Sequence, residues 1–434
     1  MCLGDYKEPT AVFDSHPFLN RTSYDGGRME TSVPIAAQQT WLNTRRLWVH
    51  GMILALCLWG TYAWIMATPG LLDRNGLVKG TDFLHFYTLG SVALERRGAE
   101  LYDMGAQAAL VQQRVPEAGK VFFLPLYAPQ VSLLFAPLAV LSYPVALSVW
   151  LAFNAALYVC CCRLIWRSCP ALRSDGWLVF LLVLAYPGFF HLIAWGQTSV
   201  LVLACFTAAY VALRAGRTFA AGLAIGCLMV KPQLGLAAAF VFLGAREWSV
   251  VSGATTSAVA QLSLGWAYYG TSVLRDYVQQ LLHTGSMRSL LEPRLYQTHS
   301  LWSFWTMLLP WPVPAFWFYV VSAVAVLVVA SLCWSSVATL SLRFSALLFA
   351  SVLVSPHLTV YDLVILAPVF LLLADWRRSA AVGDAPGLGI LLYGCYILPL
   401  TGPLARWTHL QLTVPAMVAV LRMIYRAASR REIG

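Results

Sequence analysis

The feature that most constrains this chain is a series of apolar runs long enough to cross a lipid bilayer. A run of about 20 apolar residues spans the hydrocarbon core as a helix. Hydrophobic residues make up 59% of the chain and charged residues only 11%, so too few polar side chains remain to coat a water-soluble globule. The sequence therefore predicts an all-α polytopic membrane protein. The apolar runs begin near Leu47, Trp177, Ser199, Trp248, Pro314, Phe344, Asp362, Leu388 and Leu412.

Basic residues lie at the ends of these runs rather than in one stripe. The net charge of +10 therefore indicates membrane orientation and not nucleic-acid binding. Positively charged loops stay on the cytoplasmic side, and alternation is then satisfied by about 12 transmembrane helices with both termini in the cytoplasm. The turns expected to be cytoplasmic are 45–46, 163–173, 214–217, 246, 343, 377–378 and 422–431.

Two stretches decide whether this alternation holds. Residues 218–245 must form two short helices that meet at Lys231-Pro232. Residues 124–162 contain three prolines and fit either a half-helix plus one span or two full spans, because proline interrupts the helical hydrogen-bond ladder. The first arrangement agrees with the charge alternation, and the second remains an alternative.

The chain is expected to have three parts. Residues 1–44 form a polar cytoplasmic leader that we expect to be disordered, residues 45–428 form the transmembrane domain, and residues 429–434 form a cytoplasmic tail. The domain carries a large helical first extracytoplasmic loop at 69–123 and a second large outer loop at 270–314. The ten cysteines lie mostly inside apolar runs without a CxxC pair. We therefore expect no disulfide framework, no zinc site and no cofactor.

Polar residues that membrane anchoring does not explain collect on the outer side of this topology. An ionisable residue at membrane depth is costly, so Lys231 is a functional candidate by default. Structural alternatives exist: Asp82 could cap a helix over 83–97, Asp103 could cap the next helix, and Lys231 could snorkel to water. Gln197 could be a turn residue, and His357 could bond Asp362 across a tight turn. The outer-face candidates are Asp82, His85, Tyr87, Asp103, Gln197, Lys231, His299, His357 and Asp362.

The residue types on this face limit its chemistry. A carboxylate beside lysine, arginine and histidine at membrane level suits proton removal from a hydroxyl and stabilisation of a departing phosphate. This combination indicates glycosyl transfer from a lipid phosphate. No Gly-rich phosphate loop, HExxH, GxSxG or DxD sequence supports nucleotide, zinc or serine chemistry.

An ordered set of short motifs resembles glycosyltransferase family 87, a group of GT-C-type mannosyl- and arabinofuranosyltransferases. The set covers roughly Gly80 to Asp375 and departs from the family at Tyr127, within 126–129, where Tyr-Pro-Pro is usual, and at Tyr361-Asp362, where many members have a histidine pair. The matching segments are 82–87, 101–103, 133–139, Gly196-Gln197, 222–226 with 231–233, 355–357 and 361–363.

The resemblance implies a GT-C-type fold and an active site outside the cytoplasm. The donor would be polyprenyl-phosphate-mannose or a relative, the acceptor a lipid- or glycan-borne hydroxyl, and the displacement inverting. Asp82 matches the family's loop aspartate and would be the general base. The residues expected to bind donor phosphate or substrate are Lys231, His357, Gln197, His299, Tyr87 and Asp362.

A secondary transporter is the competing interpretation. Its substrate site would lie at the midplane, where the short helices of 218–245 break around Lys231. The large first outer loop favours the glycosyltransferase, because an enzyme acting on lipid-linked sugars needs a platform at the interface. A non-catalytic scaffold would leave Asp82 and Lys231 without a purpose. The sequence does not specify the sugar, the acceptor, the linkage or the oligomeric state.

Overall fold

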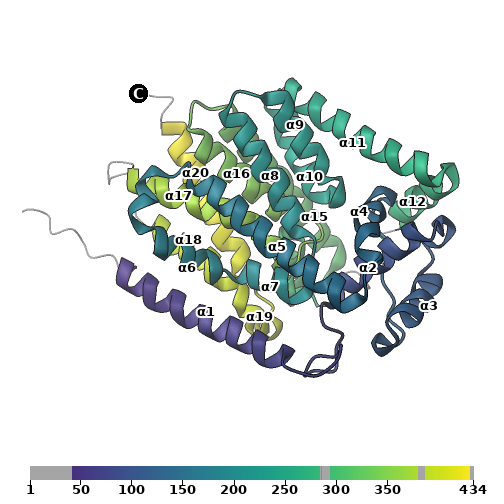
Figure 1. Cartoon of the computed structure of the whole chain (residues 1–434). Coiled ribbons are helices and arrows are strands. Elements are labelled where there is room, and N and C mark those ends of the chain that lie inside the picture. The colour runs from purple at the N-terminus through teal and green to yellow at the C-terminus, as the bar shows by residue number, and fades with distance from the viewer. Residues whose placement is uncertain (1–41, 284, 286–293, 380–386, 431–434) are drawn as a thin grey trace, which may run out of the picture. The chain divides into compact units, whose positions relative to one another are not determined.

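The computed structural model describes residues 42–283, 285, 294–379 and 387–430. Helices make up the secondary structure throughout (Figure 1), and within the described ranges β pairing is limited to two isolated bridges, Leu72 with Val78 and Thr298 with Thr359. The all-α prediction is therefore confirmed. The predictions for the leader over residues 1–41 and for residues 431–434 lie outside the described residues.

Two kinds of helix build the chain. The α-helices are α1 Thr44–Met66, α2 Thr81–Leu94, α3 Met104–Arg114, α4 Pro129–Ala139, α5 Tyr143–Trp166, α6 Gly176–Leu184, α7 Pro187–Trp195, α8 Ser199–Arg214, α9 Thr218–Gly226, α10 Pro232–Gly244, α11 Trp248–Tyr269, α12 Thr271–His283, α14 Leu301–Leu308, α15 Pro312–Ser335, α16 Leu340–Val354, α17 Ala367–Ser379, α18 Leu388–Ile397, α19 Gly402–Thr408 and α20 Thr413–Arg430. The 3-10 helices are η1 Gly98–Glu100, η2 Pro116–Ala118, η3 Pro170–Asp175, η4 Cys227–Val230, η5 Leu295–Gln297, η6 Val360–Leu366 and η7 Leu398–Thr401.

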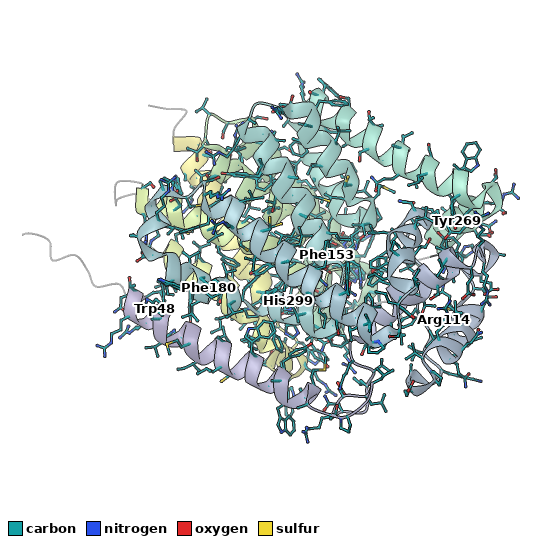
Figure 2. All side chains as sticks on the ribbon, viewed as in Figure 1. Trp48, Arg114, Phe153, Phe180, Tyr269 and His299 are labelled. Carbon is teal, nitrogen blue, oxygen red and sulfur yellow. The ribbon has the colours of Figure 1, made fainter. Side chains whose placement is uncertain are left out.

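Four helical segments of the described chain are long and apolar enough to cross a membrane. They are α1, α5, α15 and the segment Leu388–Thr408, which contains α18 and α19. The bent pair of Pro170–Leu184 and Pro187–Trp195 makes a fifth if the two segments form one span. Exposed apolar side chains on α1, α5 and α6, such as Trp48, Phe153 and Phe180 in Figure 2, suit contact with lipid. Helix length thus supports a membrane protein but does not confirm twelve crossings.

The predicted break inside 218–245 is present. The segment formed by α9 and η4 ends at Val230, Lys231 has a non-helical backbone, and Pro232 begins α10, where its missing N–H costs nothing. Gly222 lies so close to α11 that a Cβ there would approach the Val250 carbonyl oxygen to 2.1 Å. Small residues of this kind let membrane helices pack closely, so α9 against α11 fixes the position of the Lys231 turn.

Residues 124–162 form one short and one long helix. Helix α4 has 11 residues, which is too short to cross a bilayer, whereas α5 has 24. These helix lengths agree with the half-helix alternative. Helix α2 lies directly on α4, since a Cβ at Gly90 would come within 2.4 Å of the Phe135 carbonyl oxygen. This contact anchors the first loop on the transmembrane bundle.

The first loop contains the expected helical segments, with one correction. Helix α2 begins at Thr81 rather than Phe83, its N-cap is Gly80, and Asp82 lies inside the first turn, where the helix has no side-chain cap. The N-cap interpretation of Asp82 is therefore wrong. Asp103, in contrast, accepts hydrogen bonds from the backbone amides of Gly105 and Ala106 at 2.8 and 3.1 Å. Its capping role for α3 is confirmed.

Candidate active site

The turn between α7 and α8 brings Gln197 to Asp82. The Gln197 side-chain amide donates a 2.7 Å hydrogen bond to the Asp82 carboxylate. Its own oxygen accepts from the backbone N–H of Thr198 at 3.1 Å, which fixes the amide so that its nitrogen faces the acid. Two side chains of α5 hold this turn, because Trp150 donates to the Gly196 carbonyl at 2.8 Å and Asn154 to the Gln197 carbonyl at 3.3 Å.

Gly196 makes this approach possible. Its backbone is left-handed, with a φ of +69°, and a Cβ there would lie only 2.8 Å from the Cβ of Phe83. Glycine is the residue that accepts both the backbone conformation and the close contact. The Gly-Gln pair that the sequence singled out is thus a turn that joins α7 and α8 to the start of α2.

Asp82 is a partly buried carboxyl whose pKa is unusual for an aspartate. Burial raises this pKa from 3.8 to about 6. The hydrogen bond from Gln197 and then the charge of Lys231 act in the opposite direction, while the charge of Asp362 raises the pKa again and that of His357 lowers it. These four side chains therefore act on the same carboxyl, although they come from three separate segments.

Behind this carboxyl lies a buried ion pair. The Lys231 ammonium donates to Asp362 at 2.5 Å and to the Ser199 hydroxyl at 3.0 Å, and Ser199 itself donates to Asp362 at 2.6 Å. Lys231 is 5% exposed and Asp362 is 1% exposed. Snorkelling of Lys231 to water is therefore excluded. The two opposite charges satisfy each other, as a buried charge requires.

The second carboxylate oxygen of Asp362 organises the loop before it. It accepts hydrogen bonds from the backbone N–H of Thr359 at 3.1 Å and from its hydroxyl at 3.2 Å, which forms a capping box at the start of η6. Tyr186, directly before α7, holds η6 from the other side, because its hydroxyl donates to the Leu363 carbonyl at 2.7 Å. Asp362 is thus held on both oxygens.

Two tyrosines that the sequence analysis did not propose as site residues face this region. The Tyr361 ring centroid lies 4.9 Å from the Lys231 ammonium, a cation–π distance. Tyr127 precedes α4, and its pKa is raised by burial and further by the charges of Asp362 and Asp82. Both positions appeared in the sequence as departures from the family pattern, and Tyr361 also lies in the matching segment 361–363. These departures from the family pattern could have drawn attention to the two tyrosines, which lie beside the two carboxylates.

Tyr87 and His299 are placed differently from the other candidates. The Tyr87 hydroxyl donates to the Leu141 carbonyl at 2.8 Å, which ties α2 to the segment before α5. His299 is fully buried, its Nδ1 lies 2.8 Å from the Thr413 hydroxyl, and burial lowers its pKa to about 3. Its backbone N–H donates to the Leu358 carbonyl, so it supports the loop of the site from behind.

The arrangement has one carboxylate that can act as a base. Asp362 is neutralised by Lys231, whereas Asp82 is partly exposed and pairs with a neutral amide. Among the described residues, no group of three or more histidine, cysteine, aspartate or glutamate side chains is arranged to hold a metal ion. The site therefore offers a single base beside a buried cation and a histidine.

These features define a polytopic membrane protein with a polar site built where its helices break. Residues 125–356 match the family model for glycosyltransferase family 87, and the chain belongs to this family. The matched range contains Gln197 and Lys231, while Asp82 precedes it and His357 and Asp362 directly follow it. No curated protein and no solved structure shows a significant match to the chain.

Proposed function

We propose that this membrane glycosyltransferase moves a sugar, with mannose the first to test, from a polyprenyl-phosphate donor to a lipid- or glycan-borne hydroxyl. Asp82 is the general base, and the sugar carbon is inverted. The observation that carries the proposal is the Asp82 carboxyl, partly exposed, hydrogen-bonded to Gln197 and with a pKa of about 6. Such a carboxyl is mostly ionised at neutral pH and is a stronger base than an ordinary aspartate.

The leaving group is a phosphate, so the reaction needs positive charge rather than a second acid. His357 and Lys231 supply it, since both lower the pKa of Asp82 and therefore lie near the base. Lys231 already gives two hydrogen bonds to Asp362 and Ser199, which leaves one ammonium hydrogen for a phosphate oxygen. We assign Asp362 the role of counter-ion that holds Lys231 in place.

The finer features of the fold belong to the same proposal. A GT-C-type fold with about 12 crossings, an active site outside the cytoplasm and both termini inside agree with the distribution of arginines. The short helices α9 and α10 then meet near the outer interface, where a lipid phosphate lies. Labelling of an engineered cysteine at the exposed Lys120 from outside intact cells supports this orientation, and labelling only after permeabilisation contradicts it.

Transfer of radiolabelled mannose from synthetic polyprenyl-phosphate-mannose by purified protein tests the reaction. We expect a labelled product with unaltered protein and at least about 100-fold less with Asp82→Asn. A nucleotide sugar offered in place of the lipid donor should give no product. Transfer from the nucleotide sugar but not from the lipid donor would contradict the proposed donor. Family membership selects this function over the transporter interpretation.

A further inference from the structure

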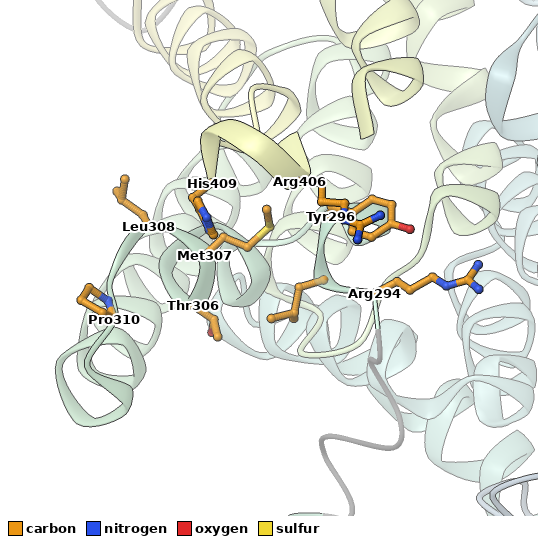
Figure 3. A pocket seen from close by; sticks show the side chains of 9 residues that line it. Arg294, Tyr296, Thr306, Met307, Leu308, Pro310, Arg406 and His409 are labelled. Carbon is orange, nitrogen blue, oxygen red and sulfur yellow. The ribbon is translucent and has the colours of Figure 1, made fainter. Parts of the chain in front are cut away.

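A cavity with a mixed polar and apolar lining contains neither Asp82 nor Lys231. It has a volume of about 960 Å³ and is formed by η5, the end of α14 and the end of α19. Figure 3 shows Arg406 beside Tyr296, with Arg294 lower on the same side of the view, and Met307, Leu308 and His409 on the other side. One side is therefore cationic and aromatic, while the other is largely apolar.

Within the described residues, the two arginines in this cavity have no acidic partner. Both side chains are exposed, and neither forms an ion pair with any residue in the described part of the chain. The Arg406 guanidinium carbon lies 5.9 Å from the Tyr296 ring centroid, which holds the side chain against the cavity wall. Guanidinium groups with free N–H donors are suited to bind phosphate.

The cavity lies where two candidate membrane spans end. Leu308 lies just before α15, which spans Pro312–Ser335, and Arg406 belongs to the last turn of the span Leu388–Thr408. Two exposed tryptophans directly follow lining residues in the sequence. Trp407 is 83% exposed and Trp311 is 63% exposed. Exposed tryptophans at the ends of spans mark the level of lipid head groups. The span ends and the exposed tryptophans therefore favour a position for the cavity near the lipid phosphates.

The cavity wall is also connected to the loop of the catalytic site. Gln411 donates hydrogen bonds to the carbonyl oxygens of Tyr296 and Thr298, at 3.2 and 2.6 Å. Thr298 pairs with Thr359 in an isolated β bridge, and Thr359 binds the Asp362 carboxylate. A ligand against Tyr296 would thus contact a segment that supports η6.

We propose that this cavity is a second phosphate site, which binds the phosphate of an anionic membrane lipid between Arg294 and Arg406 while the lipid tail follows the apolar side toward α15. It is separate from the Lys231 site that we assign to the donor. The inference rests on two guanidinium groups without an acidic partner among the described residues, a lining that is cationic on one side and apolar on the other, and the ends of two candidate spans beside the cavity. It does not depend on the sugar or the acceptor.

Binding of short-chain phosphatidic acid to the purified full-length protein tests the proposal. We expect Arg294→Gln/Arg406→Gln to weaken this binding at least about tenfold, since each charged hydrogen bond contributes substantially to affinity. Arg217→Gln, which removes an exposed arginine elsewhere, should bind as the unaltered protein does. Circular dichroism and the melting temperature of each variant show that the fold is kept. Equal binding by the double variant would overturn the proposal.

Two further probes identify the source of the phosphate. Diacylglycerol with the same tails should not compete, because it lacks the charge, and inorganic phosphate should compete at least about tenfold more weakly than phosphatidic acid, because it lacks the tail. Full competition by inorganic phosphate would make this a free-phosphate site and overturn the lipid proposal. Asp82→Asn should bind phosphatidic acid normally, which separates this outcome from failure of the proposed transfer reaction.

Discussion

Gln197 and Asp82 are 115 positions apart in the chain and share a 2.7 Å hydrogen bond. This contact joins the turn after α7 to the first turn of α2. It stabilises the ionised form of the acid, whereas burial stabilises the protonated form. The basicity of Asp82 is therefore set by two elements that must dock correctly before the site exists.

Asp82→Asn should abolish most transfer while leaving the protein folded. The asparagine keeps the shape of the side chain and can still accept from Gln197, but it cannot take a proton. We expect transfer to fall at least about 100-fold, as measured with the labelled lipid donor. Transfer within a few-fold of the unaltered protein would remove Asp82 from the mechanism.

Asp103→Ala is the matched control in the same loop. Asp103 caps α3 through the amides of Gly105 and Ala106. Loss of such a cap costs about 1 kcal/mol of stability. We expect a lower melting temperature with nearly unchanged transfer per folded molecule. A 100-fold loss of transfer in Asp103→Ala would show that disturbing the loop is enough to stop transfer, so the effect of Asp82→Asn would not identify the base.

Transfer should decline as the pH falls through about 6. The base must be ionised, and the pKa of Asp82 is raised to about 6, so kcat/KM should follow a single acidic limb near that value. Stability has the opposite dependence. The folded pKa lies above the ordinary 3.8, so protonated Asp82 contributes stability below about 3.8, and this contribution is lost as the pH rises through about 6. A decline of kcat/KM near pH 4 instead would contradict the raised pKa of the buried Asp82 carboxyl.

Gln197→Leu should move that limb to higher pH. The hydrogen bond from Gln197 lowers the pKa of Asp82, so its removal should raise this pKa by roughly one unit. One pKa unit corresponds to about 1.4 kcal/mol of interaction with the ionised carboxylate. Gln107→Leu is the control, because Gln107 is also buried but donates to the Leu101 carbonyl at 2.7 Å instead. An unmoved limb in Gln197→Leu would mean that another group titrates.

Lys231→Met should destabilise the protein and also prevent transfer. It leaves Asp362 buried without its counter-ion, which costs about 3–5 kcal/mol. Adding Asp362→Asn removes the uncompensated charge, so the double variant should recover much of the melting temperature. Transfer should not recover, because the cation near the base is still missing. A double variant with near-normal transfer would assign Lys231 a structural role alone.

Gly196→Ala should displace the base from its partner. The position has a φ of +69°, and the new Cβ would approach the Phe83 Cβ to 2.8 Å. We expect a loss of about 1–3 kcal/mol in the free energy of unfolding together with reduced transfer. Gly216→Ala has the same kind of backbone, with a φ of +70°, but open space around the Cβ. It should show a smaller loss of stability and normal transfer.

Hydropathy and charge predicted most helices because lipid imposes length and composition on each span. Apolar runs at Ser199, Trp248 and Leu388 begin where α8, α11 and α18 begin, and the break at Lys231 is present. Crossing number was harder, since several apolar helices have only 10–17 residues. Hydropathy along the sequence shows one long apolar run at places where the chain forms two short helices.

Side-chain pairing was not predictable from the same patterns. Asp362 was expected to contact substrate, yet it pairs with Lys231, which is 131 positions away. Which acid meets a given lysine depends on how α8, η4 and η6 pack, and one sequence does not contain that information in its periodicity. For Asp82, the residue type suggested a helix cap, but the residue lies in the first turn of α2 and does not cap the helix.

The ion pair between Lys231 and Asp362 has a consequence for turnover. After the sugar leaves, the spent lipid phosphate gains negative charge, and a lone buried ammonium would retain it strongly. An ammonium that already shares its charge with a carboxylate holds such an anion less tightly. We therefore expect Asp362 to limit product inhibition, so that the used carrier lipid departs and the next donor enters.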